Sequence, residues 1–231
     1  MTTTVSSATQ KKILYPTGDG KPVAETFDHL YALLITLEVL RQYLAGQQAT
    51  VLGNQFMYYA KDIPKLRVAP DVMVIFDVAP GGRDNYKIWE EGSVPSVIFE
   101  MTSASTREKD DDSKYELYEN LGVTEYWQFD PKAEWIEDGL RGYRLSREEI
   151  YIPITDNTSR VLGLRLAVND SIIDFYTLDT GEKLLIPDEL RQRADQEAQR
   201  ADREAQRADQ AEAELKALKA KLKAQGIELD L

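Results

Sequence analysis

The stretch of sequence that decides the fold comes in three pieces: Pro70-Asp71-Val72-Met73-Val74-Ile75-Phe76, Ser96-Val97-Ile98-Phe99-Glu100-Met101-Thr102-Ser103 and Val123-Thr124-Glu125-Tyr126-Trp127-Gln128-Phe129-Asp130-Pro131. Near-continuous apolar runs of this length are typical of strands buried on both faces of a sheet, so we expect helices on both sides. Asp71 precedes the first run, and Glu100 lies near the end of the second. A carboxylate at a strand edge packs poorly in a core but is well placed to hold a metal ion.

Two helices and one bent strand are expected around this stretch. Apolar residues recur at helical spacing from about Glu25 to Ala45, and again from Asp110 to Leu121. The β-rich run from Thr50 to Ala60 is expected to form one strand, bent near Gly53 and Asn54. The connection over residues 79–94 is expected to hold one short helical turn.

Beyond Gly139 the pattern changes to short β segments, which predict a β-rich annex. These segments are Tyr143–Leu145, Ile150–Ile154, Val161–Val168 and Ile172–Tyr176. The sequence thus predicts an α/β domain, a mixed sheet flanked by helices. We expect three parts: a disordered lead over 1–15, the α/β domain over 16–187 and a helical tail over 188–231.

The tail carries a seven-residue repeat, seen in residues 195–201 and 202–208. Alanines from Ala194 to Ala208 alternate in steps of four and three, and Leu215, Leu218 and Leu222 continue after a slip in phase near Ala211. This pattern permits a weak coiled coil, and with it a homo-oligomer. A solvated single helix held by Glu–Arg pairs fits the sequence equally well.

Composition limits the classes of protein to which this chain can belong. The 231 residues include no cysteine, which excludes disulfides and Cys-ligated metal centres. No apolar run reaches the roughly 20 residues of a membrane span, and the N-terminal residues lack the pattern of a secretory signal, so we expect a cytoplasmic protein without membrane contact. The formal net charge is -12. The core therefore repels nucleic acid unless a local basic ridge or a bridging cation compensates.

Asp71 and Glu100 suit a site for phosphodiester hydrolysis if their strands are neighbours in the sheet. Such a reaction needs a hard cation, a deprotonated water and charge compensation on the leaving oxygen. Magnesium prefers oxygen ligands, usually one or two carboxylates. A different interpretation remains open at this point: Asp71 caps a turn after Pro70, and Glu100 pairs with a buried arginine.

The residues around both acids resemble the Uma2-like family, a group of unknown function that is abundant in cyanobacteria. The resemblance rests on Pro70-Asp71, Phe99–Arg107, Asp110, Lys114, Tyr118, Gly122-Val123 and Glu125-Tyr126-Trp127, with Gly18–Pro22, Glu25 and His29 upstream. It covers roughly Tyr15 to Pro187. That family is classed with the PD-(D/E)XK restriction-endonuclease-like superfamily, which implies a restriction-endonuclease-like fold and a metal-dependent endonuclease acting on DNA.

The resemblance also implies a set of metal ligands. Asp71 matches the aspartate of the motif and Glu100 its second acid, so both would bind Mg²⁺ or Mn²⁺. The backbone carbonyl of Met101 would be a third ligand. Glu25 would match the acid that many members supply from the first helix.

The motif's lysine should stand at residue 102, which is a threonine here. Lys114 is the position that matches a lysine displaced to the following helix, where it would assist the attacking water. Lys114 could instead be an exposed helix lysine paired with Asp110, four residues earlier.

Contacts to DNA would come from basic and aromatic side chains near the two acids. The basic residues form a candidate ridge: Lys61, Lys65, Arg67, Arg83, Lys87 and Arg107. Tyr58, Tyr86, Trp89 and Trp127 are candidates for stacking on bases, although a tryptophan within a strand also suits the core. Ser103, Ser105 and Thr106 could hold a phosphate, or could cap the next helix.

Two functions from different classes therefore compete. The first is a Mg²⁺-dependent endonuclease with Glu25, Asp71, Glu100 and Lys114 in its site. The second is a non-catalytic module with a degenerate nuclease fold that mediates protein or nucleic-acid interactions. Thr102 in the place of the lysine and the acidic core favour the second.

Overall fold

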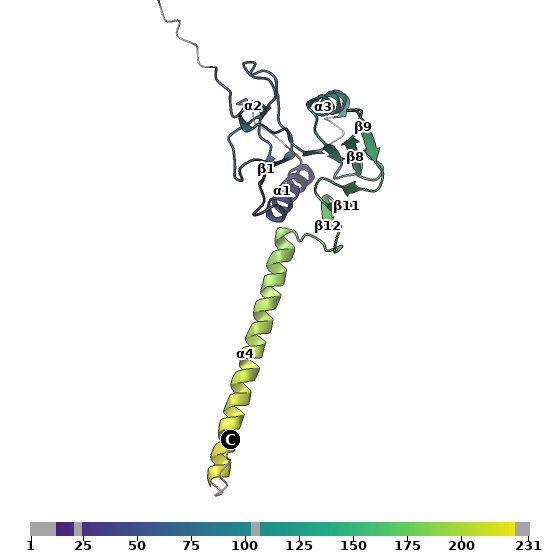
Figure 1. The fold of residues 1–231 in the computed structure, drawn as a ribbon. Helices are drawn as coiled ribbons and strands as arrows, with labels where there is room; N and C mark the ends of the chain where they lie inside the picture. Colours follow the sequence, from purple (N-terminus) through teal and green to yellow (C-terminus); the bar gives the residue numbers. More distant parts are fainter. Residues whose placement is uncertain (1–12, 21–24, 103–106, 225–231) are drawn as a thin grey trace, which may run out of the picture. The chain divides into compact units, whose positions relative to one another are not determined.

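The computed structural model describes residues 13–20, 25–102 and 107–224, without the side chains of 107–112 and 223. The chain divides into two compact units, Met1–Leu184 and Leu185–Leu231 (Figure 1). Residues 1–12 of the expected lead, and the candidate phosphate-binding residues Ser103, Ser105 and Thr106, lie outside the described residues. Tyr15 packs edge-on against Tyr58, with ring centroids 5.1 Å apart.

A six-stranded mixed sheet forms the centre of the first unit. Its strands, in spatial order, are β1 (Ala49–Gly53), β4 (Val72–Phe76), β6 (Val97–Met101), β7 (Glu125–Phe129), β8 (Leu140–Leu145) and β9 (Tyr151–Ile154). β6 and β7 are parallel, and the other neighbouring pairs are antiparallel. The apolar runs at Val72 and Val97 are fully buried in adjacent central strands. The predicted α/β class with a mixed sheet is confirmed.

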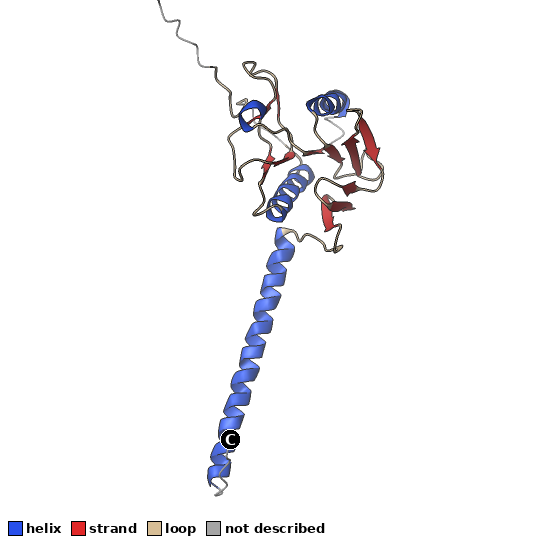
Figure 2. Ribbon diagram, in the orientation of Figure 1, coloured by secondary structure: helices blue, strands red, loops and turns tan. Residues whose placement is uncertain are grey.

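Two helices cover the sheet, α1 (Phe27–Tyr43) and α3 (Arg107–Leu121). Helix α1 contacts β1, β4 and β6, whereas Tyr118 of α3 packs against Tyr126 of β7, with ring centroids 5.2 Å apart. Figure 2 shows the two helices on opposite sides of the sheet. Helix α1 begins two residues later than expected, because Thr26 is its N-cap and accepts a hydrogen bond from the backbone N–H of His29.

The single bent strand expected over residues 50–60 is wrong. Asn54 adopts a left-handed conformation with φ 55°, which turns the chain between β1 and β2 (Met57–Tyr58). β2 belongs to a separate three-stranded sheet with β3 (Arg67–Val68) and β5 (Tyr86–Lys87). The expected helical turn in residues 79–94 is α2 (Ile88–Glu91).

The β-rich annex divides between two sheets. β8 and β9 extend the central sheet, and only β10 (Thr158–Ser159), β11 (Leu164–Asn169) and β12 (Ile172–Thr177) form a sheet of their own. Glu125 of β7 ties the two sheets together. Its fully buried carboxylate accepts hydrogen bonds from the Ser159 hydroxyl and the Arg160 backbone N–H.

The second unit is dominated by α4 (Pro187–Ala224), a helix of 38 residues. Arg193 and Glu197 form an ion pair one turn apart, at 3.0 Å. Leu215 and Leu218 are 51% and 55% exposed. None of the helices that the structure describes combines the length and apolar content needed to span a bilayer.

Candidate active site

Asp71 and Glu100 meet because their strands are neighbours. β4 and β6 pair antiparallel with Val72 opposite Phe99, so Asp71 comes opposite Glu100 one step along the same register. Glu100 faces α3, whereas the carboxylate of Asp71 lies beside His29 of α1.

The N-terminal end of α1 brings two further groups to Asp71. The His29 Nε2 atom lies 3.7 Å from Asp71 Oδ2 and 3.8 Å from Glu25 Oε2. Glu25 precedes the helix and accepts a hydrogen bond from the Asn54 side chain at 3.3 Å. Asp71 Oδ2 also accepts a hydrogen bond from the backbone N–H of Met101 at 2.7 Å, which fixes the carboxylate against β6.

The acids around His29 affect its ionisation. The pKa of His29 is raised above its usual value by Asp71 first, and further by Glu25 and Glu100, while burial opposes the shift. Its distances of 3.7 and 3.8 Å to the two carboxylates are those of ion pairs rather than hydrogen bonds. The carboxylates around His29 thus favour its protonated form.

Two side chains of α3 donate hydrogen bonds to Glu100. It is only 3% exposed. The Tyr118 hydroxyl donates to its Oε1 at 2.6 Å, and the Lys114 ammonium donates to its Oε2 at 2.9 Å. Lys114 is 24% exposed. The side chain of Asp110, its partner in the alternative interpretation, lies outside the described residues.

Thr102, at the motif's lysine position, turns away from the acids. Its hydroxyl is buried and donates to the Phe129 carbonyl at 3.2 Å, which continues the pairing of β6 with β7. Lys114 is therefore the lysine that the described structure places against Glu100.

Burial perturbs the ionisation of Glu100 strongly. Burial raises the pKa of Glu100 to about 7, with a further upward contribution from Asp71, while Lys114 and Tyr118 act to lower it. Taking a carboxylate out of water disfavours its charged form, and here the nearby lysine compensates only in part.

We expect this raised pKa to make the metal-free protein less stable as the pH rises. The folded pKa of about 7 exceeds the ordinary value of 4.5, so the stabilisation is complete below pH 4.5 and is lost as the pH rises through 7. The free energy of unfolding in EDTA should fall by about 2 kcal/mol between pH 5 and pH 8 from this group. Denaturant titrations at the two pH values measure this decrease in unfolding free energy. The decrease should be smaller in Glu100→Gln. An equal fall in both proteins would contradict the assignment.

The donor atoms suit a hard divalent cation. Glu25, Asp71 and Glu100 offer carboxylate oxygens, which Mg²⁺ and Mn²⁺ prefer. In the part of the chain that the structure describes, no group of three or more His, Cys, Asp or Glu residues is already arranged around a metal position. Each Glu100 oxygen accepts one bond from α3, and since a carboxylate oxygen has two lone pairs these bonds do not exclude a cation. The described contact of Met101 with the site is made by its N–H, not its carbonyl.

Three of the six residues of the candidate basic ridge are engaged within the fold, whereas Lys61 and Lys65 are exposed and the Arg107 side chain lies outside the described residues. Arg83 pairs with Glu91 at 3.0 Å, and Lys87 pairs with Glu90 at 3.0 Å. The Arg67 guanidinium lies 4.4 Å from the centre of the Phe56 ring. These three side chains therefore offer little free charge to a DNA backbone.

The proposed stacking residues are mostly core residues. Tyr58, Tyr86 and Trp127 are fully buried, so the prediction that they stack on bases is wrong. Trp89 is half-buried and packs against Tyr15, with ring centroids 5.3 Å apart.

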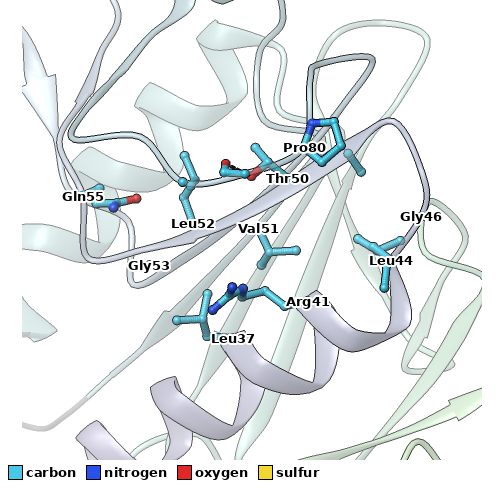
Figure 3. Close-up of a pocket in the computed structure, with 14 residues that line it drawn as sticks. Leu37, Arg41, Leu44, Gly46, Thr50, Val51, Leu52, Gly53, Gln55 and Pro80 are labelled. Carbon is cyan, nitrogen blue, oxygen red and sulfur yellow. Dashed lines mark hydrogen bonds between the residues drawn. The ribbon is translucent and has the colours of Figure 1, made fainter.

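A cavity of about 340 Å³ lies apart from these residues, between the C-terminal half of α1, the edge strand β1 and the loop at Pro80 (Figure 3). Leu37 and Arg41 line one wall, and Thr50 and Leu52 line the other. None of the predicted site residues lines it.

Two residues of the site were not assigned roles from the sequence. Tyr118 follows Lys114 by four residues, and that spacing on a helix is the signal that both reach the same partner. His29 follows Glu25 by four residues in the same way, and the structure places it between Glu25 and Asp71.

Comparisons with known proteins gave a family and a solved structure to which the chain is similar. None of the functionally curated proteins matches the chain. A solved structure from Anabaena variabilis, described as "a putative nuclease belonging to DUF820", aligns with a TM-score of 0.47 at 15% identity, covering 67% of this chain and 87% of that one. The model of the Uma2 family, described as "putative restriction endonuclease", matches residues 9–169. The chain therefore belongs to the Uma2 family.

Proposed function

We propose that this protein is a metal-dependent endonuclease that hydrolyses DNA phosphodiester bonds at the site of Asp71 and Glu100. One observation supports the proposal most strongly: Lys114 from the following helix pairs with Glu100, and the strand of Glu100 is a neighbour of the strand that Asp71 precedes. The description of the family as restriction-endonuclease-like supports the same reaction class. The proposal includes a cytoplasmic location, where DNA is accessible.

In this proposal, Asp71 and Glu100 hold Mg²⁺ or Mn²⁺, and Glu25 supports the site from beside α1. The cation would lower the pKa of a bound water and neutralise charge on the phosphate. The Met101 N–H orients Asp71, and the Tyr118 hydroxyl orients Glu100, at 2.7 and 2.6 Å. Both acids are therefore preorganised by bonds that do not involve the substrate.

Lys114 has two roles in the proposal. Without a cation, its ammonium neutralises Glu100 at 2.9 Å. Once released from Oε2, the same ammonium lies next to the acids, where it can orient the attacking water and stabilise charge that develops on the phosphate. Hydrolysis forms a bond from the water oxygen to phosphorus and breaks the bond to the leaving sugar oxygen.

The net charge of -12 sets a condition on DNA binding. Several basic side chains near the site are paired with acids of the protein, as Arg83 is with Glu91. A phosphate can approach three carboxylates only if positive charge accompanies it. We therefore expect DNA binding to depend on the divalent cation as well as on low salt.

Plasmid cleavage tests the proposal. The full-length protein should nick or linearise supercoiled plasmid with Mg²⁺ or Mn²⁺ and not with EDTA. Lys114→Ala should slow cleavage roughly 100-fold, because it removes the positive charge next to the acids. Lys132→Ala is the matched control, since Lys132 is an exposed lysine of the same unit outside the candidate basic ridge, and should cleave normally. Equal rates for Lys114→Ala and the wild type would rule out the role of Lys114.

The non-catalytic module keeps one observation in its favour. Every oxygen of Glu100 already accepts a bond from α3, a closed arrangement that also suits a purely structural ion pair. The two functions differ in metal binding. A protein that takes up neither Mg²⁺ nor Mn²⁺ and retains no DNA at low salt is a module rather than a nuclease.

A further inference from the structure

One set of apolar positions of α4, from Ala194 to Leu222, is arranged as a palindrome. From Ala194 to Ala208 they recur in steps of 4, 3, 4 and 3, and from Ala208 to Leu222 in steps of 3, 4, 3 and 4. The slip in phase near Ala211 is thus the point at which the order of the steps reverses. Reversal about one residue is what a two-fold axis across a helix requires, because the axis maps each position onto one equally far on the other side.

We propose that α4 pairs antiparallel with α4 of a second copy of this chain, with Ala208 facing Ala208 at the two-fold axis. Each leucine of one helix then faces an alanine of the other. The facing pairs are Leu222 with Ala194, Leu218 with Ala198, and Leu215 with Ala201.

Matching large to small residues keeps the two helices at an even distance. The separation of packed helices depends on the side chains at the contact, over roughly 8–10 Å. A parallel pair would set alanine against alanine at one end and leucine against leucine at the other, so the two ends would need different separations. The antiparallel pair combines one leucine and one alanine in each outer layer.

The antiparallel pair also accommodates the extra step of three residues from Ala208 to Ala211, which lies next to the two-fold axis. An insertion of three residues in a heptad pattern overwinds a left-handed supercoil locally. In the antiparallel pair this region of both helices lies at the two-fold axis, so the two distortions coincide. The seam covers Ala194 to Leu222, about 42 Å of helix.

The charges that flank the seam favour the same orientation. Acidic side chains line both sides of the alanine half, including Asp195 and Glu197, whereas Lys219 and Lys221 flank the leucine half. The antiparallel pair brings Asp195 to Lys219 and Glu197 to Lys221, twice each by symmetry. Asp202 meets Glu212 and Glu204 meets Glu214 in this orientation, so the attraction between opposite charges is confined to the outer layers.

A parallel pair would be held by fewer opposite charges. It would set Glu197 against Asp202 and Glu204 against Asp209, and it would gain only the contact of Glu214 with Lys219.

In the antiparallel pair, the N-terminal ends of the two α4 helices lie at opposite ends of the rod. Pro187 of each helix lies 21 residues from Ala208, so the two Pro187 residues are roughly 60 Å apart along the rod.

Disulfide trapping in the full-length chain tests the orientation, because the natural sequence contains no cysteine. An equal mixture of Ala198→Cys and Leu218→Cys chains should form a mixed disulfide dimer roughly tenfold faster than either variant alone. Light scattering of the unmodified chain should give twice its mass of 26.3 kDa at high micromolar concentration. Efficient self-trapping of Ala198→Cys would overturn the proposal in favour of a parallel pair, and a monomeric mass would overturn it in favour of a single helix.

A charge exchange gives an independent test that needs no cysteine. Asp195→Lys should weaken the dimer severalfold, since it places a lysine against Lys219, and the double variant Asp195→Lys with Lys219→Glu should restore it. In a parallel pair Asp195 faces Leu190, so the single change would leave the dissociation constant unaltered. Sedimentation at two salt concentrations measures the three constants, and an unaltered constant would overturn the antiparallel assignment.

Discussion

Replacing Asp71 with asparagine is expected to slow DNA cleavage roughly 1,000-fold while leaving the fold intact. Asparagine is close to aspartate in shape, and its side-chain oxygen can still accept the bond that the Met101 N–H makes to Asp71 at 2.7 Å. What is lost is the negative charge next to His29 and opposite Glu100. A cation held by oxygen ligands loses its strongest attraction when a ligand becomes neutral.

The matched control for this change is Asp62→Asn, an aspartate on the exposed surface of the same unit. It should cleave plasmid at the wild-type rate under the same metal concentration. Thermal unfolding of Asp71→Asn shows whether the variant is folded. A folded Asp71→Asn protein that cleaves as fast as the wild type would mean that cleavage comes from another site or from a contaminant.

Replacing Glu125 with alanine is expected to be the most damaging single change to stability, costing about 3 to 5 kcal/mol of unfolding free energy. The Glu125 side chain is fully buried, and its carboxylate pairs with Arg144 Nε at 3.0 Å. It also accepts bonds from the Ser159 hydroxyl and the Arg160 N–H. Alanine would leave a largely buried guanidinium and two donors without their acceptor.

Denaturant unfolding of Glu125→Ala and Glu116→Ala measures this effect against a control. Glu116 is exposed on α3, so its replacement by alanine should change stability by less than about 0.5 kcal/mol. The loss at Glu125 should be accompanied by exposure of the β10–β12 sheet, because the carboxylate joins that sheet to β7. A loss below about 1 kcal/mol would show that the buried ion pair does not hold the two sheets together.

The sequence predicted the elements of the fold better than their pairing. The apolar runs at Val72 and Val97 gave two buried strands, because an uninterrupted apolar run has few other uses in a small domain. The turn at Asn54 was underestimated, because a left-handed residue inside a β-rich run leaves only a weak local signal. The place of β8 and β9 in the central sheet depends on the pairing of β8 with β7 and of β9 with β8, which the local sequence pattern does not encode.

For the site too, the sequence identified the residues better than the contacts between them. Asp71 and Glu100 were found as acids at strand edges, but their meeting depends on β4 and β6 being neighbours, a matter of topology. Thr102 marked a departure from the motif, and only the structure shows that Lys114 reaches Glu100. The burial of Tyr58 and Tyr86 could not be foreseen, since tyrosine suits both a core and a stacking surface.

The most direct test of the account is calorimetric titration of Mn²⁺ into the metal-free, full-length protein. The account predicts saturable binding in the wild type and in Asp62→Asn, and none in Asp71→Asn. Binding should also release protons near pH 7, because a cation at Glu100 favours the charged form of a carboxyl whose pKa is raised to about 7. A wild-type protein that binds no Mn²⁺, or an Asp71→Asn protein that binds it as well as the wild type, would contradict the account.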